Sequence, residues 1–209
     1  MKKTTNSRDK KDEMANILLK IDALKFGVFK LSTGKASPYY IDLRVIPSFP
    51  DVFSEICEFY AQTIMNEIGL KNFVRIAGIP IAGIPFSSQI AYNLKKPFLY
   101  MRKGVRLSGR ERRVEGILVS GDRVLLVDDL LTTGSTLKKA ADAVRAEGGV
   151  VTDAVVFLDR EEGGRYLLEK TGVTLHAILR ISEIANTLYE IGAIDQDSLI
   201  TIQKQIKKQ

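Results

Sequence analysis

The sequence predicts an α/β fold with a central parallel sheet flanked by helices. Apolar runs alternate with helix-length segments from residue 73 onward, which is typical of parallel strands joined by helices. Residues 124–127 (VLLV) are apolar without interruption, as expected of a strand covered on both faces. The chain has 209 residues, 45% of them hydrophobic, and this length supports one core and one domain.

The individual elements follow in chain order. Residues 1–12 are polar and basic, so we expect a disordered tail. The helix that follows Pro50 has apolar residues at helical spacing. The expected segments are a helix over 13–24, strands near 29 and over 39–43, a helix over 51–68, alternating strands and helices over 73–77, 82–93, 97–101, 123–127, 137–147, 150–158, 163–171 and 173–179, and a last helix from about 195.

Residues 124–136, VLLVDDLLTTGST, carry the main functional signal. The apolar strand meets two adjacent carboxylates, Asp128 and Asp129. Burying an unpaired charge costs several kcal/mol, so the sequence predicts that the strand stops here and that the pair lies at its C-terminal edge. Open α/β sheets bind their ligands at this edge.

Hydroxyl groups and a glycine follow the carboxylates. Gly134 allows backbone N–H groups to approach a ligand, and a helix from Leu137 would direct its unpaired N–H groups toward the same place, which favours an anion. Carboxylates would repel a plain phosphate, but they accept from sugar hydroxyls and favour Mg²⁺. Phosphoribosyl pyrophosphate fits this combination. The other interpretation is a buried strand that ends in an ordinary N-capped loop.

This segment resembles the phosphoribosyl pyrophosphate signature of type I phosphoribosyltransferases. Two further stretches resemble orotate phosphoribosyltransferases. Residues 26–44 (FGVFKLSTGKASPYYIDLR) are similar to the hood of that family, and residues 157–165 (FLDREEGGR) to the strand end that places an arginine on orotate. The similarity runs over about 17–191. It implies the type I phosphoribosyltransferase fold, with a hood over about 13–45, a core over about 50–192 and a C-terminal helix over about 195–208.

The resemblance also implies the reaction. A glycosyltransferase of the pentosyl-transferring type would join orotate to phosphoribosyl pyrophosphate, giving orotidine 5′-monophosphate and pyrophosphate in the pathway to UMP. Asp128 and Asp129 would hold the ribose hydroxyls and stabilise the cationic sugar, and Mg²⁺ would be held mainly by the substrate. Family members share active sites across a homodimer, so we expect a homodimer here.

The site residues implied by the resemblance fall into three groups. The catalytic residues would be Asp128, Asp129 and Arg106. Phosphoribosyl pyrophosphate would be bound by Ile81, Ala82, Arg102, Lys103, Arg106, Ser108, Asp128, Asp129, Leu130, Leu131, Thr132, Thr133, Gly134, Ser135 and Thr136. Orotate would be bound by Tyr40, Ile41, Thr132 and Arg160.

This chain departs from the family pattern in its mobile loop. Orotate enzymes usually carry a lysine, an aspartate and a histidine there, and this chain has Arg106, Leu107 and Ser108. Ala82 and Ser32 also stand where bacterial relatives carry lysines. The loop implies a slow enzyme, an enzyme whose extra arginines compensate, or a paralogue that binds without turnover.

Several of these residues have a plainer interpretation. The segment 77–83 could be an ordinary strand-to-helix turn. Tyr40 and Ile41 point to opposite sides of a strand, so one of them could face away from the base. Arg160 could form a surface salt bridge with Asp159, Glu161 or Glu162.

Two other functions would keep the segment 128–136. A phosphoribosyltransferase for a purine base would need a different base pocket, and residues 26–44 and Arg160 argue against it. A regulatory sensor of phosphoribosyl pyrophosphate that binds nucleic acid, or an inactive paralogue, would explain the altered loop. About a dozen polar residues before the first helix leave no room for a DNA-reading module.

The net charge of +6 is concentrated in one loop. Residues 102–113 hold six basic residues against Glu111 alone, without interleaved aromatic residues, which favours a basic lid over pyrophosphate and no nucleic-acid binding. Apolar runs are too short for a membrane span, so we expect a cytoplasmic protein that does not bind membranes. Cys57, the single cysteine, is expected on the buried face of a helix, and His176, the single histidine, in a core or edge strand with a satisfied ring.

Overall fold

The computed structural model describes residues 7–30, 36–102 and 113–207. Its strands are β1 (Leu24–Lys30), β2 (Ala36–Ile41), β3 (Arg75–Gly78), β4 (Phe98–Met101), β5 (Val114–Glu115), β6 (Val124–Leu131), β7 (Asp153–Asp159) and β8 (Thr174–Arg180). Its helices are α1 (Ser7–Lys20), α2 (Pro50–Thr63), α3 (Gly83–Asn93), α4 (Ser135–Ala146), α5 (Gly164–Lys170), α6 (Ile181–Glu190) and α7 (Gln196–Lys207), with a 3-10 turn η1 (Leu43–Ser48) and a π-helical turn η2 (Ile64–Ile68).

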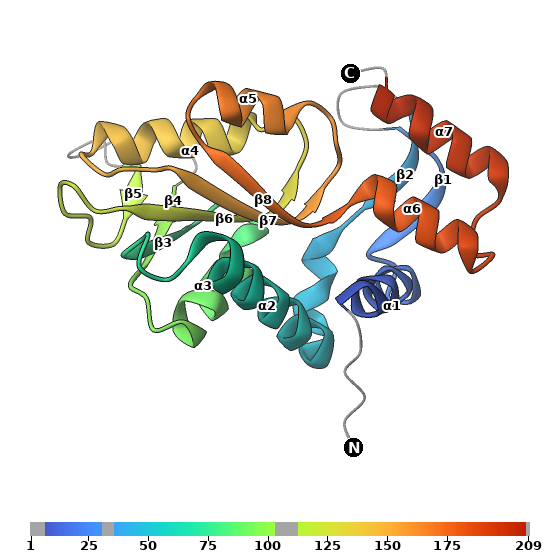
Figure 1. Ribbon diagram of the computed structural model, residues 1–209, viewed down its shortest axis with the longest axis horizontal. Helices are drawn as coiled ribbons and strands as arrows, with labels where there is room; N and C mark the ends of the chain where they lie inside the picture. Colours follow the sequence, from blue (N-terminus) through green and yellow to red (C-terminus); the bar gives the residue numbers. More distant parts are fainter. Residues whose placement is uncertain (1–6, 31–35, 103–112, 208–209) are drawn as a thin grey trace.

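The main sheet has the strand order β5-β4-β3-β6-β7-β8 within the described residues. All pairings are parallel except that of β4 with β5. Helices α4 and α5 cover one face, and α2 and α3 cover the other (Figure 1). This arrangement confirms the predicted α/β class, with a mostly parallel sheet between two helical layers.

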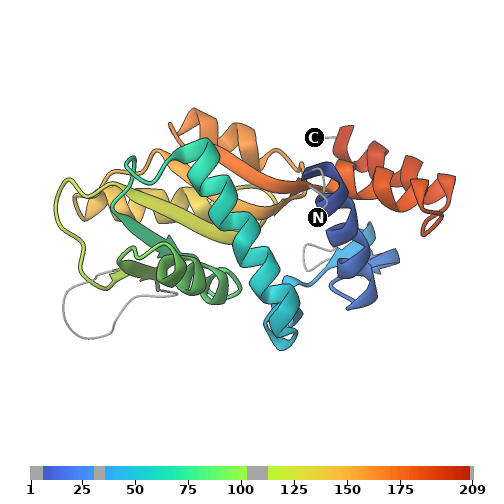
Figure 2. The same cartoon turned by 60° about the horizontal axis from the view of Figure 1, so that its bottom comes forward.

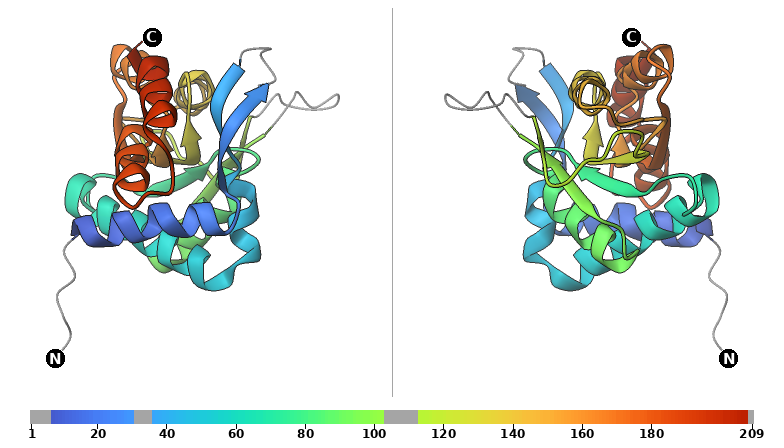
Figure 3. Two further views of the ribbon diagram at one scale, coloured as in Figure 1. Left: turned by 90° about the vertical axis from the view of Figure 1, so that its right-hand side faces the viewer. Right: turned by 90° about the vertical axis from the view of Figure 1, so that its left-hand side faces the viewer.

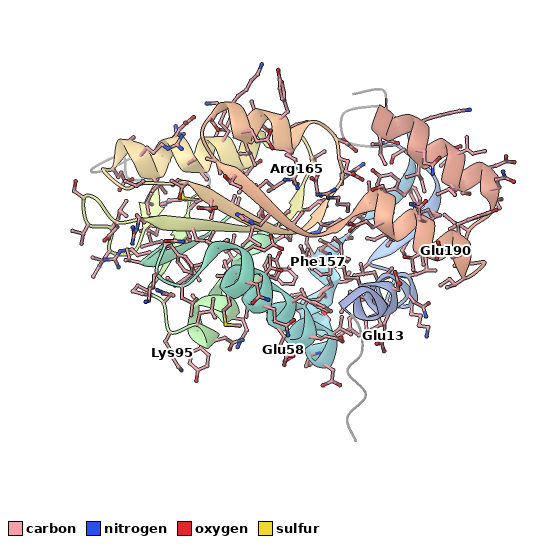
Figure 4. The ribbon with its side chains drawn as sticks, in the orientation of Figure 1. Glu13, Glu58, Lys95, Phe157, Arg165 and Glu190 are labelled. Atoms are coloured by element: carbon pink, nitrogen blue, oxygen red, sulfur yellow. The ribbon has the colours of Figure 1, made fainter. Side chains whose placement is uncertain are left out.

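Successive side chains of the central strands point alternately to the two faces of the sheet. Leu125 and Val127 of β6 pack into the core beneath α2 and α3, whereas Val124 and Leu126 pack beneath α4 and α5. Because side chains alternate along a strand, a run that is apolar throughout is the sequence of a strand buried on both faces. The same alternation places Phe157 of β7 toward α2 (Figure 4).

A smaller unit stands at one end of the sheet. β1 and β2 form an antiparallel hairpin, and helices α1, α6 and α7 gather around it (Figures 2 and 3). Buried side chains from α1 and α6, including Leu18 and Leu188, belong to the same apolar cluster as the α2 face of the sheet. The hairpin occupies the region predicted as the hood.

The structure differs from the predicted elements most clearly at α1, β5, β6 and α6. α1 begins at Ser7, so it includes part of the tail that was expected to be disordered, and it ends at Lys20 because Asp22 adopts a left-handed conformation (φ 59°). β6 runs to Leu131, four residues beyond the predicted end. β5 and α6 were not predicted. The signal for α6 was present in its apolar residues at helical spacing and in Glu183, whose side chain accepts from the backbone N–H of Arg180.

No helix in the described ranges combines the length and apolar character that crossing a membrane requires.

Candidate active site

The carboxylate pair lies where β6 extends beyond the last residue of the neighbouring strand β3. β3 pairs with β6 only as far as Gly78 opposite Val127, whereas β7 continues beside β6 to Leu131. Asp128 and Asp129 therefore belong to the strand, but one flank of this stretch has no strand beside it. The prediction that the strand stops at the pair was wrong, because pairing with β7 satisfies the backbone and lets the strand continue.

The two carboxylates are buried, at 8% and 9% exposure. Burial raises the pKa of Asp128 well above its ordinary value, and the neighbouring charge of Asp129 raises it further. Burial also raises the pKa of Asp129, with hydrogen bonding to Asp128 acting in the opposite direction. Burial thus favours the protonated form of Asp128 relative to an exposed carboxyl group, which reduces the repulsion between the two adjacent acids.

Helix α2 fixes the backbone at the pair. Tyr60 is fully buried and donates from its hydroxyl to the carbonyl oxygen of Asp128 at 2.6 Å. The backbone N–H of Asp129 donates to Oδ1 of Asp128 at 3.0 Å. These bonds hold the first carboxylate in one orientation at the open flank of β6.

The loop between β3 and α3 packs directly against Asp128. A Cβ atom added to Gly83 would lie 2.6 Å from Oδ1 of Asp128, so a side chain at this position would displace the carboxylate. Ala82 is the N-cap residue of α3, and Ile81 is 68% exposed. The structure thus brings the predicted pyrophosphate loop, with the N-terminus of an 11-residue helix, beside the carboxylates.

The loop after β6 forms a cradle at the start of α4. Gly134 has a φ of 76° and is the N-cap residue, and the unpaired N–H groups of the helix start lie at this loop. Its cavity of about 70 Å³ is lined by Asp128, Leu130, Leu131, Thr132, Thr133, Gly134, Ser135, Thr136 and Leu137. A pocket of hydroxyls and helix N–H groups suits a phosphate.

Helix α5 supports this cradle through a second glycine. A Cβ on Gly134 would lie 2.7 Å from the carbonyl oxygen of Gly164, and one on Gly164 would lie 2.5 Å from the carbonyl oxygen of Thr132. Only hydrogen fits at either position, so the start of α5 holds the loop from behind. Sequence reasoning missed Gly164, whose partner is thirty residues away in the chain.

Arg160 follows β7 and is 7% exposed. Its Nη2 forms an ion pair with Oε1 of Glu162 at 2.7 Å, and Nε2 of Gln205 in α7 donates a hydrogen bond to the same oxygen at 3.2 Å. The guanidinium carbon is 4.9 Å from the centre of the Tyr39 ring. The alternative reading of Arg160 as an ion-pairing residue is therefore present in the structure, but the pair is buried and not on the open surface.

The hairpin separates neighbouring side chains by strand alternation. Tyr39 is fully buried against Arg160, whereas Tyr40 is 36% exposed and lies 5.7 Å from Phe29 between ring centres. Ile41 is 9% exposed. Tyr39 was not among the predicted base contacts, because the sequence does not show which face of this strand looks toward Arg160.

Part of the predicted site lies outside the described residues. This applies to Ser32, Lys103, Arg106, Leu107 and Ser108. Arg102, at the edge of that segment, is exposed and pairs with Glu115 at 3.3 Å.

Two residues that were predicted to be structural are confirmed as such. Cys57 is fully buried in α2, where burial raises the pKa of its thiol to about 12. His176 in β8 has both ring nitrogens bonded, Nδ1 with Glu67 at 3.0 Å and Nε2 with Asp153 at 2.8 Å.

Known proteins share this sequence and fold. A family model described as the phosphoribosyl transferase domain matches residues 50–170. The orotate phosphoribosyltransferase of Staphylothermus marinus is 39% identical over 204 residues, covering 98% of each chain. The crystal structure of orotate phosphoribosyltransferase from Aeropyrum pernix has a TM-score of 0.76 at 30% identity and covers 87% of this chain and 99% of that one. The UMP synthase of Leishmania donovani has a TM-score of 0.84 at 29% identity, covering 97% of this chain and 43% of that one.

The fold, the carboxylate pair with its anion cradle and the match over 50–170 together define the class as type I phosphoribosyltransferases. The relatives identify one family within this class, because the match to the Staphylothermus marinus enzyme extends over nearly the whole of both chains. The chain belongs to the orotate phosphoribosyltransferase family. This confirms the resemblance seen in residues 26–44, 128–136 and 157–165.

Proposed function

We propose that this site joins N1 of orotate to C1 of phosphoribosyl pyrophosphate, releasing pyrophosphate and forming orotidine 5′-monophosphate for pyrimidine biosynthesis. The observation that carries the proposal is the buried pair Asp128 and Asp129 beside an anion cradle, in a chain of the orotate phosphoribosyltransferase family. The pair and the cradle supply the two kinds of contact that a phosphorylated sugar needs.

The described residues divide the substrate between them. The loop 132–136 and the start of α4 hold the 5′-phosphate, and the backbone around Ala82 and Gly83 faces the pyrophosphate. As the C1–O bond breaks, positive charge develops on the ribose and negative charge on pyrophosphate. Asp128 and Asp129 accept hydrogen bonds from the ribose hydroxyl groups. In their ionised form they also stabilise the positive charge on the ribose.

Mg²⁺ is proposed as the cofactor, because carboxylate and phosphate oxygens are the groups that this ion prefers. Two buried carboxylates with raised pKa values offer hard oxygen ligands, and the described residues contain no group of three or more acidic, histidine or cysteine side chains that could hold a metal. The ion would be held mainly by oxygens of phosphoribosyl pyrophosphate, with Asp128 and Asp129 nearby and no direct ligand from the protein. The bound ion would supply positive charge to the leaving pyrophosphate.

Arg160 is proposed to recognise the orotate carboxylate. A guanidinium can donate two parallel hydrogen bonds to a carboxylate, and a buried position strengthens such a pair. Thr132, on the loop that lines the cavity, is proposed as a second contact with the base. Tyr40 and Ile41, which directly follow the buried Tyr39 in β2, remain predicted base contacts.

We also propose a homodimer and a cytoplasmic location. A homodimer would let residues 103–112 of one subunit serve the site of its partner, as the family resemblance implies. Light scattering of the purified chain over a range of concentrations tests the assembly, and a monomer at the concentration of full activity would contradict the shared site.

The activity is tested by following orotate absorbance with purified protein, phosphoribosyl pyrophosphate and Mg²⁺. The signal should fall only when all components are present, and the product should be orotidine 5′-monophosphate. Binding of phosphoribosyl pyrophosphate without any loss of orotate would contradict the proposal and favour the sensor, for which the replacement of the loop histidine by Ser108 is the supporting observation.

A further inference from the structure

Three buried polar atoms in the described residues lack a hydrogen-bond partner, and all three lie in one contact. They are the hydroxyl of Tyr39 and the Nε and Nη2 atoms of Arg160. Buried polar groups are almost always paired, so such a cluster needs an explanation. Its position between the hood strand β2 and the end of β7 places it at the proposed orotate contact.

The guanidinium of Arg160 is held from two directions. The ring of Tyr39 lies 4.9 Å from its central carbon, and Oε1 of Glu162 lies 2.7 Å from Nη2 in a geometry that does not complete a hydrogen bond. Gln205 in turn holds Glu162. The guanidinium carbon lies over the Tyr39 ring, while the ion pair with Glu162 acts at Nη2, so these two contacts limit how Arg160 can move.

We propose that Tyr39 is a positioning residue that aligns Arg160 for the carboxylate of orotate. The inference rests on the proposed function, and it assigns the ring of Tyr39 and not its hydroxyl as the active feature. A planar carboxylate accepts two bonds well only when the guanidinium is coplanar with it, and a fixed aromatic face selects that plane.

The protonation state of Tyr39 agrees with this role. Burial raises the pKa of its hydroxyl, and the nearby charge of Arg160 lowers it by less. Tyr39 therefore stays neutral at physiological pH. A phenolate would form an ion pair with Arg160 and compete with orotate, whereas a neutral ring supports the guanidinium and leaves its charge to the substrate.

The test compares two replacements of Tyr39 by steady-state kinetics. Tyr39→Leu removes the aromatic face and is expected to raise the KM for orotate about ten- to thirty-fold, with kcat and the KM for phosphoribosyl pyrophosphate within about twofold. Tyr39→Phe keeps the face and should stay within about threefold of the parent. Tyr92→Leu, at an exposed tyrosine on α3, is the control. If Tyr39→Leu does not fold, Tyr39→Met keeps a similar buried volume without an aromatic face.

A double-mutant cycle shows whether Tyr39 acts through Arg160. In an Arg160→Ala background, Tyr39→Leu should change kcat/KM for orotate by less than about twofold. Additive effects, an equal rise in both KM values, or a Phe variant as weak as the Leu variant would overturn the inference. If the parent protein itself does not consume orotate, the proposed function fails; an active parent with an unchanged Leu variant would refute only the role of Tyr39.

Discussion

The proposed phosphate side and the proposed base side of the site are built in different ways. The phosphate side is one continuous segment, 128–136, in which a buried strand, a loop and a helix start follow each other directly. The base side joins Tyr39 from the hood, Arg160 and Glu162 after β7, and Gln205 from α7. The first depends on local backbone geometry, and the second on how separate elements pack.

Because of this difference, the two sides of the site should tolerate amino-acid substitutions to different extents. On the phosphate side, Gly83 and Gly134 are fixed because backbone or a carboxylate occupies the space of a Cβ. On the base side, the contacts are between side chains, which can vary in concert while the fold is kept. If the two sides have the proposed roles, we expect substitutions to change base specificity more readily than binding of the phosphorylated sugar.

The largest expected effect comes from removing both charges of the phosphate side. The double variant Asp128→Asn with Asp129→Asn should lower kcat/KM by about 10³ or more, because the amides accept from hydroxyls but do not stabilise the cationic ribose. Orotate consumption measures this. Asp142→Asn, at an exposed carboxylate paired with Lys138 on α4, is the control and should keep parental activity. A double variant with more than a tenth of parental activity would show that the pair is not catalytic.

The next effect separates the base side from the phosphate side. Arg160→Ala should raise the KM for orotate by about 10², because loss of a buried charged donor costs about 2–5 kcal/mol. The KM for phosphoribosyl pyrophosphate should change less than threefold. Arg123→Ala, which removes an exposed arginine bonded to the carbonyl of Lys71, is the matched control. A parallel rise in both KM values would mean that the two sides are not independent.

The same contrast explains what the sequence could predict. The phosphate side could be proposed from the sequence because its residues are contiguous, and the alternation of apolar segments predicted the fold class that the structure confirms. The length of β6 was missed, since pairing with β7 depends on a strand over twenty residues away. The packing of Gly134 against Gly164 depends likewise on distant backbone.

On the base side, the sequence predicted a role for Arg160 but did not single out Tyr39, the residue whose ring lies beside it. A strand alternates its side chains, so a one-residue difference decides which of Tyr39 and Tyr40 is buried. Both neighbours are tyrosines, and hydrophobicity cannot choose between them. Only the packing of the hairpin against Arg160 and α7 makes the distinction, with Tyr39 fully buried and Tyr40 at 36% exposure.

A smaller effect tests the electrostatics of the phosphate side in the absence of substrate. The pKa of Asp128 is raised in the folded state, so folding favours its protonated form. The contribution of the protonated Asp128 carboxyl group to the free energy of unfolding is fully present below its pKa in the unfolded chain, about 4. This contribution is lost as the pH rises through the pKa of Asp128 in the folded protein. Asp128→Asn cannot ionise, and we expect it to melt at a higher temperature than the parent at pH 8 but at the same temperature near pH 4.

Each unit of pKa shift corresponds to about 1.4 kcal/mol, and for a chain of this size each kcal/mol moves the melting temperature by about 2–4 °C. Thermal unfolding followed by circular dichroism from pH 4 to 8 measures the difference. Asp142→Asn should show no gain that grows with pH. A constant offset between parent and Asp128→Asn across this range would argue for a packing effect in place of a titration.

The smallest effect is expected from a substitution at His176, which tests whether function is confined to the phosphate side and the base side. His176 lies near the start of β8 and Asp153 begins β7, so their contact is at the opposite end of these strands from the site. Glu67, the other partner, has a side chain 57% exposed, and polar contacts at such exposed positions contribute at most about 1 kcal/mol to stability. His176→Gln should therefore lower the melting temperature by a few degrees at most. Its kcat and both KM values should equal those of the parent, because the ring supports the sheet edge and touches neither substrate. A fall in kcat without a fall in stability would extend the functional surface to this end of the sheet.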